Sequence, residues 1–165
     1  MMRSIKRILL PTLLTLLVLQ GCGFHLRGAV ILPDEMEATW VDGSGVSVEL
    51  VRSVREGVRR TNGGVVSGES DATAILELSN ETFSRRVATV DSSTGKVSEY
   101  ALDYQVDWKL RSVDGALLDQ GHLKQKESYK YSGTEVLGKE QEEKYLREVM
   151  IREAVRDLLR ALRRR

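Results

Sequence analysis

The feature that most constrains the fold is a strict alternation of apolar and polar side chains along residues 100–111. The apolar members of this segment occupy the even positions, namely Tyr100, Leu102, Tyr104, Val106, Trp108 and Leu110. Successive side chains of a β-strand point to opposite faces, so the pattern predicts one long strand with a buried face and a wet face. Such a strand needs neighbouring strands and a second layer to cover its apolar side.

Further strands are predicted on both sides of this one, because alternating segments are separated by turn residues. A first strand is expected at residues 37–41, and a second at residues 74–90, where a bulge would interrupt the alternation. Residues 91–96 form the next turn. After the hairpin dipeptide Asp114-Gly115, residues 117–131 are expected to pair with the long strand. The result is a meander of long strands.

Two other segments repeat their apolar residues every three or four positions, which is typical of amphipathic helices. In the first, the apolar residues at that spacing are Leu50, Val51, Val54 and Val58. Asn62-Gly63-Gly64 is expected to end this helix with left-handed or flexible backbone. The second helix is expected over residues 139–162, with acidic residues at its start and arginines at its end that complement the helix dipole.

The order strand, helix, three strands, helix predicts the α+β class. We expect a two-layer sandwich in which two helices pack on one face of a four-stranded, largely antiparallel sheet. Residues 35–165 would form this single domain. The second face of the sheet would stay available to solvent or to a ligand.

The first 21 residues have the layout of a secretion signal, in which basic residues precede an apolar run over residues 8–19. Twelve residues of helix reach roughly 18 Å, which is too short to span a bilayer. Leu19-Gln20-Gly21-Cys22 resembles the bacterial lipobox, whose cysteine becomes an acylated mature N-terminus. We therefore expect a lipoprotein signal peptide over residues 1–21. Cys22 would carry covalent diacylglycerol and an N-acyl chain, followed by an acylated tether over residues 22–34.

Two alternatives for the N-terminal segment are a buried helix of the domain and an unmodified thiol at Cys22. The first leaves the basic start and the abrupt Gly21-Cys22-Gly23 end unexplained. The second leaves a secreted protein with an unpaired cysteine. Gly23 stands where lipoproteins that stay in the inner membrane carry Asp, so the lipobox resemblance implies the outer membrane.

Catalysis, metal binding and nucleic-acid binding have little support in the sequence. The chain has one cysteine and two histidines, and it contains no G-x-S-x-G, H-E-x-x-H or P-loop motif. We expect no enzyme, no catalytic residues, no metal site and no cofactor beyond the lipid on Cys22. Without its basic leader the domain is slightly acidic, which argues against non-specific nucleic-acid binding.

A cationic patch is predicted on the wet face of the sheet. Its members on the last expected strand are His122, Lys124, Lys126 and Lys130, and the neighbouring strand adds Lys109 and Arg111. Lysine binds phosphate well as a point charge, so these residues could meet an anionic amphiphile. Asp103 and Asp107 limit the patch. Ordinary solvation of a half-buried sheet is the alternative.

The segment around the expected anchor, Gly21-Cys22-Gly23-Phe24-His25-Leu26-Arg27-Gly28, resembles the start of the lipopolysaccharide-assembly lipoprotein family, LptE, also called RlpB. The expected strand at Trp40-Val41, the long strand that opens at Glu99-Tyr100 and the acidic-to-basic final helix are similar to the layout of that family. The resemblance covers essentially the whole mature chain.

This resemblance implies a lipid-anchored outer-membrane protein that sits as a plug inside the LptD β-barrel. It would help that barrel assemble and assist insertion of lipopolysaccharide into the outer leaflet. Phe24, His25 and Arg27 are then candidates for contact with the partner. Lys139, in the loop expected before the last helix, joins Lys124, Lys126 and Lys130 as a candidate for contact with lipopolysaccharide.

A different class of function remains open from the sequence. The same scaffold could belong to a periplasm-facing lipoprotein that binds or inhibits a cell-wall enzyme. The fold alone does not separate the two, because one scaffold serves many partners. Stoichiometric isolation with a large barrel is the observation that distinguishes them.

Overall fold

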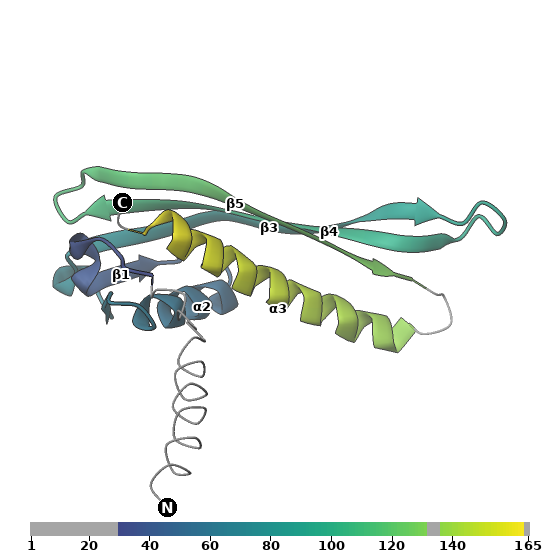
Figure 1. Cartoon of the computed structure of the whole chain (residues 1–165), viewed down its shortest axis with the longest axis horizontal. Coiled ribbons are helices and arrows are strands. Elements are labelled where there is room, and N and C mark those ends of the chain that lie inside the picture. Colours follow the sequence, from purple (N-terminus) through teal and green to yellow (C-terminus); the bar gives the residue numbers. More distant parts are fainter. Residues whose placement is uncertain (1–29, 132–135, 164–165) are drawn as a thin grey trace, which may run out of the picture.

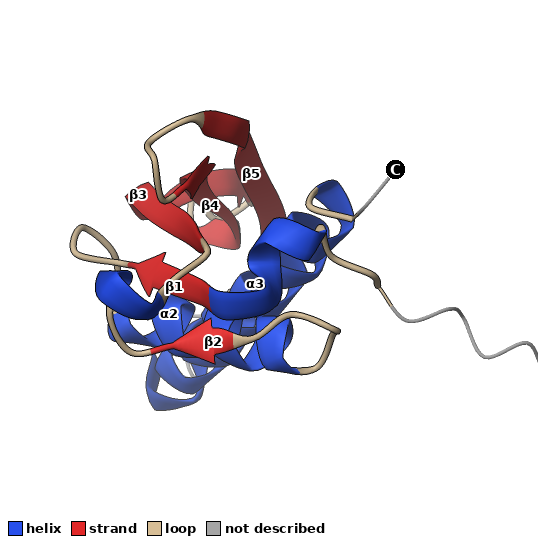
Figure 2. Cartoon of the chain, turned by 90° about the vertical axis from the view of Figure 1, so that its left-hand side faces the viewer, coloured by secondary structure: helices blue, strands red, loops and turns tan. Residues whose placement is uncertain are grey.

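The computed structural model describes residues 30–131 and 136–163, and for residues 136–139 only the backbone. Its elements follow the order η1 (Asp34–Ala38), β1 (Thr39–Asp42), α2 (Val48–Arg59), β2 (Val65–Val66), η2 (Glu69–Asp71), β3 (Ala74–Val90), β4 (Val97–Ser112), β5 (Leu117–Lys130) and α3 (Val136–Ala161). The strands form one sheet, and both α-helices pack against one of its faces (Figures 1 and 2).

The sheet has five strands in the order β2-β1-β3-β4-β5, so the expectation of four strands was wrong. The missing strand, β2, contains only two residues, which is too short to show an alternating pattern. β3, β4 and β5 form the predicted antiparallel meander, whereas β1 pairs parallel with both β2 and β3. The parallel pairing arises because α2 carries the chain back to the start of β1 before β2 forms.

Several boundaries differ from those expected. The first strand begins at Thr39, because the preceding residues form the short 3-10 helix η1. Gly63 and Gly64 have no left-handed backbone; a Cβ on Gly64 would instead lie 2.1 Å from the Glu37 carbonyl oxygen. The helix ends before this segment as expected, but the pair is needed for the close approach of η1 and supplies no left-handed backbone.

The predicted bulge in β3 is present, and it has a specific consequence. The register with β4 shifts between Ser79 and Thr82, and Asn80 adopts a positive φ of 53°. The shift aims the Glu81 carboxylate at the start of α2. Ser47, the N-cap of α2, donates to it from both its backbone N–H (2.5 Å) and its hydroxyl (2.9 Å).

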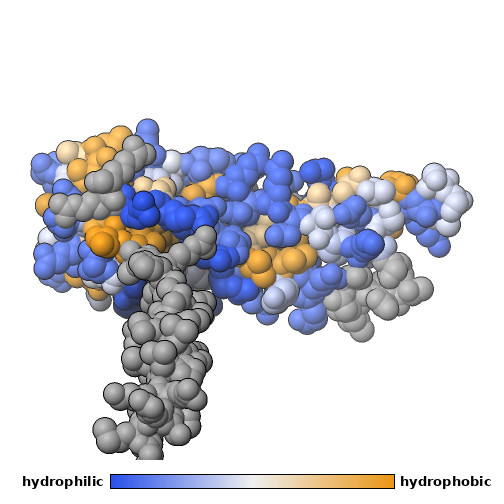
Figure 3. Space-filling view, viewed as in Figure 1, coloured by the Kyte–Doolittle hydropathy of each residue, from blue (hydrophilic) through white to orange (hydrophobic). Residues whose placement is uncertain are grey.

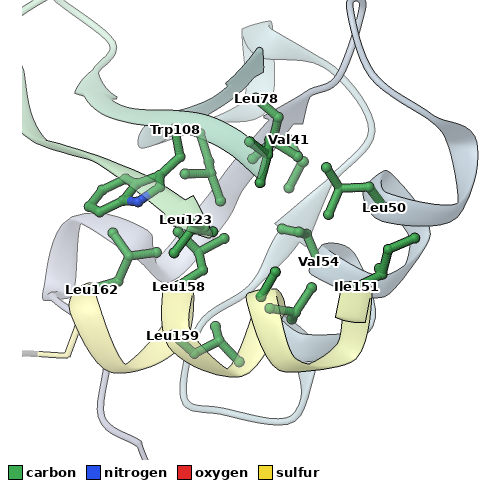
Figure 4. Packing of buried hydrophobic residues seen from close by; sticks show 14 of the residues in the cluster. Val41, Leu50, Val54, Leu78, Trp108, Leu123, Ile151, Leu158, Leu159 and Leu162 are labelled. Atoms are coloured by element: carbon green, nitrogen blue, oxygen red, sulfur yellow. The ribbon is translucent and has the colours of Figure 1, made fainter. Parts of the chain in front are cut away.

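The core lies between the sheet and the two helices, as Figure 4 shows. The alternating apolar side chains of β4 enter it as predicted, with Tyr104 fully buried and Trp108 nearly so. α2 and α3 touch at Gly57, where a Cβ would lie 2.9 Å from a methyl group of Val155. α3 begins at Val136, earlier than expected, so Lys139 belongs to its first turn and the predicted loop position was wrong.

Candidate ligand-binding face

The outer face of the sheet, on the side away from α2 and α3, carries the predicted cations. β5 is an edge strand, and all of its predicted cations are exposed, namely His122, Lys124, Lys126 and Lys130. In the ladder with β4, His122 lies opposite Asp107, Lys124 opposite Gln105 and Lys126 opposite Asp103. Paired residues of a ladder share a face, so the structure brings these side chains together.

Both aspartates of the outer face are engaged by other groups. The Asp107 carboxylate accepts a bond from the Asn80 amide at 2.7 Å and lies 2.6 Å from Nδ1 of His122. These two contacts, the Asn80 bond first, hold the pKa of Asp107 below its ordinary value. Asp103 forms a 3.1 Å ion pair with Nε of Arg86 from β3. Neither carboxylate forms a direct ion pair with a lysine of the described residues.

Lys124 and Lys126 are consequently the most available positive charges of this face. Within residues 30–131 and 140–163, the side chain of neither forms a hydrogen bond or an ion pair. Lys130 stands opposite Glu99, whose carboxylate accepts bonds from the hydroxyls of Ser128 (2.7 Å) and Thr89 (3.1 Å). These bonds lower the pKa of Glu99. Exposed lysines without partners can bind an anionic group without first breaking an internal ion pair.

The remaining predicted cations are placed differently. Arg111 pairs with Glu77 at 3.0 Å, so its charge is already matched within the face. Lys109 lies on β4 opposite Gln120. Lys139 has only its backbone described, in α3. Cys22, Phe24, His25 and Arg27 lie outside the described residues.

Sequence reasoning missed the contribution of two neighbouring arginines, Arg85 and Arg86. Consecutive residues of a strand point to opposite faces, so two adjacent arginines in the expected strand indicate one arginine on each face of the sheet. Arg86 joins the outer face through Asp103. Arg85 turns to the inner face, where it pairs with Glu143 of α3 at 2.7 Å and lies 4.8 Å from the ring centre of Tyr100.

The inner-face contacts continue into an aromatic group beside α3. The Tyr129 hydroxyl donates to Glu143 at 2.9 Å, and the Tyr100 ring meets the ring of Tyr131 edge-on, with 5.2 Å between centres. A cavity of about 320 Å³ adjoins them, lined by Phe83, Arg85, Glu140, Glu143, Lys144 and Arg147. These contacts fasten the start of α3 to the sheet.

A larger hollow, of about 870 Å³, lies between α2 and α3. Its walls carry both signs of charge, including Arg52, Glu56, Glu148 and Arg152, above the small contact at Gly57. Across the described part of the chain, no group of three or more metal-binding side chains occurs. The helices there include none with the length and apolar character needed to cross a membrane.

A comparison with known families identifies the domain. The model of a family described as "LptE: Lipopolysaccharide-assembly" matches residues 35–162, which is most of the chain. The chain belongs to the LptE family. The resemblance predicted from the segment around Cys22 is thereby confirmed by a match that starts after that segment.

Curated relatives carry the same family name. The chain is 29% identical over 149 residues to the LPS-assembly lipoprotein LptE of Photorhabdus laumondii, covering 90% of this chain and 81% of the relative. It is 31% identical over 91 residues to the LPS-assembly lipoprotein LptE of Pectobacterium atrosepticum, covering 54% of this chain and 48% of that protein. These relatives support placing the chain among lipoproteins of lipopolysaccharide assembly.

Solved structures of bacterial lipoproteins share the fold. Lipoprotein B of Nitrosomonas europaea matches with a TM-score of 0.68 and 25% identity, covering 84% of this chain and 88% of that one. The rare lipoprotein B of Shewanella oneidensis matches with a TM-score of 0.63 and 24% identity, covering 74% and 91%. Sheet and helices are therefore arranged in this chain as in these two solved structures.

Proposed function

We propose that this LptE-family protein is an outer-membrane lipoprotein that plugs the LptD β-barrel, helps it assemble and assists insertion of lipopolysaccharide into the outer leaflet. The observation that carries the proposal is the family match over residues 35–162. Lipopolysaccharide assembly is the process named by that family and by both curated relatives.

The distribution of charge supports the plug. A barrel lumen is polar, so a protein that fills it must have a polar surface on most of its sides. Here the outer sheet face is polar along most of β4 and β5, and the exposed sides of both helices are rich in arginine and glutamate. The apolar residues of β4 are buried in the internal core and are not exposed on the surface.

Attachment to the membrane is proposed to occur through lipid on Cys22, with diacylglycerol on sulfur and an N-acyl chain. Several acyl chains give durable anchoring without a transmembrane helix. Phe24, His25 and Arg27 follow the anchor directly and are proposed to contact the barrel. The domain would then lie inside the lumen, with its N-terminal side toward the periplasm.

Contact with lipopolysaccharide is proposed to run through the lysines of the outer face. Lys124 and Lys126 are exposed and unpaired within the described residues, and Lys130 extends their row along β5. The lysine ammonium groups would bind the phosphate groups of lipopolysaccharide as point charges. Lys139, in the first turn of α3, is the fourth candidate.

The test of this proposal compares two double variants, each of which replaces two basic residues with glutamate. Full-length protein with Lys124→Glu and Lys126→Glu is expected to bind purified lipopolysaccharide about ten-fold more weakly, because two phosphate contacts become repulsive. The matched control carries Arg52→Glu and Arg59→Glu, which make the same charge change on α2. Equal weakening by both pairs would show that only net charge matters and would contradict a binding site on the outer face.

A further inference from the structure

The chain enters the domain at one end of the sheet. β1 begins at Thr39, which pairs with Ala74 at the start of β3, and Ala74 pairs with Ser112 at the end of β4. η1 and residues 30–33 therefore reach the domain at the end that carries the β4–β5 hairpin. The β3–β4 hairpin lies at the opposite end (Figure 1).

At the entry end, a row of apolar residues crosses the outer face. Ladder partners connect Val66 to Trp40, Trp40 to Ile75, and Ile75 to Arg111. Arg111 is paired in turn with Leu117 of β5. Four of the five members of this row are apolar, whereas the adjacent row runs through Asp42, Glu77, Lys109 and Gln120. This row lies at the end where the tether arrives, although the opposite end also exposes apolar side chains, at Val87 and Val90.

The β4–β5 hairpin extends this apolar surface into solvent. Leu117 is 51% exposed, Leu118 is 43% exposed and Val113 is 58% exposed. The register jumps by one residue here, so Leu118 is the extra residue of a bulge beside Leu117. Ile31, one residue after the start of the described chain, is also 54% exposed. Figure 3 shows apolar side chains gathered at this end, over the hairpin.

We propose that the β4–β5 hairpin tip, defined as Val113, Leu117 and Leu118, rests in the interfacial layer of a lipid bilayer. Val30 follows Cys22 by only eight positions, and an extended chain covers at most roughly 3.5 Å per residue. An acylated Cys22 would therefore hold this end within about 30 Å of the membrane surface. The proposal rests on the lipid anchor of the proposed function, and it adds a second membrane contact that fixes how the domain is oriented.

Charges of both signs surround this end of the molecule. Exposed carboxylates lie there, namely Asp34, Glu35, Glu37, Glu69, Asp71, Asp114 and Asp119, and exposed arginines stand at the ends of α2 and α3, namely Arg59, Arg60, Arg160 and Arg163. The contact therefore depends on burial of apolar side chains, and binding should depend little on salt.

The first experiment reads the position of each hairpin in the acylated full-length protein. A polarity-sensitive fluorophore is attached to Leu118→Cys, or to Val90→Cys at the opposite end, where the native valine is 50% exposed. In phosphatidylcholine vesicles we expect a blue shift and protection from an aqueous quencher at 118 and neither at 90. Labelling of the unaltered chain would reveal a free Cys22 thiol and contradict the anchor on which the proposal rests.

The second experiment removes the anchor. The chain from residue 23 onward retains the whole core, because the buried cluster runs from Leu32 to Leu162. Flotation with phosphatidylcholine vesicles is expected to fall about ten-fold in Leu117→Ser/Leu118→Ser, since two half-exposed leucines lose their burial. The matched control, Val87→Ser/Val90→Ser, replaces residues of equal exposure at the other end and should float like the parent.

Two results would overturn the proposal. One is equal access of the quencher to positions 118 and 90 together with unchanged flotation of the leucine variant. The other is a probe at 118 that stays accessible on vesicles and becomes protected only when a barrel protein is added, which would assign the tip to a protein partner.

Discussion

At the scale of single residues, Gly121 controls how the largest side chain of the core is packed. It lies in β5 opposite Trp108 of β4. A Cβ on Gly121 would lie 2.8 to 2.9 Å from three atoms of the indole ring. The indole ring is stiff and is held by the core, so it has no room to move aside.

Gly121→Ala is therefore expected to lower the free energy of unfolding by about 1 to 3 kcal/mol, the usual range for overpacking a core. Chemical denaturation measures this directly. Gly45→Ala is the matched control, because a Cβ there meets nothing within 4 Å. Similar losses in both variants would contradict the role of close contact with Trp108.

Asp91 gives a second prediction at this scale. Its carboxylate accepts bonds from the backbone N–H and hydroxyl of both Ser93 and Thr94, which close the β3–β4 turn. These bonds, the Ser93 hydroxyl first, lower the pKa of Asp91 to about 2 from an ordinary 3.8. A lowered pKa means that the stabilisation is complete above the ordinary value and is lost as the pH falls through about 2.

The measurement is a carboxyl titration by NMR, with the amide shifts of Ser93 and Thr94 followed in parallel. All three signals should move together near pH 2, and Asp91→Asn should abolish the transition at both amides. A midpoint at the ordinary pKa of an aspartate would show that the turn does not hold the carboxylate.

At the scale of elements, the bulge in β3 joins a strand to a helix. Glu81 accepts from the N-cap residue Ser47 and, at 2.9 Å, from the hydroxyl of buried Tyr104. Burial and the neighbouring Glu81 carboxylate raise the pKa of Tyr104, so its hydroxyl stays a donor. One carboxylate thus fixes the start of α2 against β4.

Glu81→Ala should reduce the free energy of unfolding by about 2 kcal/mol, because it leaves the buried hydroxyl of Tyr104 without an acceptor. Amide hydrogen exchange should rise first in α2. Glu127→Ala, at an exposed position of β5, is the control. Unchanged protection of α2 in the Glu81 variant would contradict the account.

The elements also show what could be predicted from the sequence. β4 was predictable because its core face is uninterrupted from Leu102 to Leu110, and the two helices because their apolar residues recur at helical spacing. β2 was not predictable, because a strand of two residues is too short to show an alternation of apolar and polar side chains. The cations of β5 were placed on one face by alternation alone, whereas the pairing of Asp103 with Arg86 depends on the register between β3 and β4.

At the scale of the whole molecule, the proposed functions are assigned to different surfaces. The entry end carries the apolar hairpin tip, the outer face carries unpaired lysines, and the β3–β4 hairpin extends beyond the helices at the far end (Figure 1). This arrangement would let one end meet the membrane while the charged face meets lipopolysaccharide within a polar lumen. The orientation follows from the position of residue 30 at the entry end.

Isolation from native membranes is the most direct test of the proposal that this LptE-family domain works inside a barrel. The full-length protein with an affinity tag at its C-terminus is purified in mild detergent and analysed by mass spectrometry. We expect a large outer-membrane β-barrel in near one-to-one ratio, together with acyl chains on Cys22. Recovery of the lipoprotein alone, or with a cell-wall enzyme in that ratio, would contradict it.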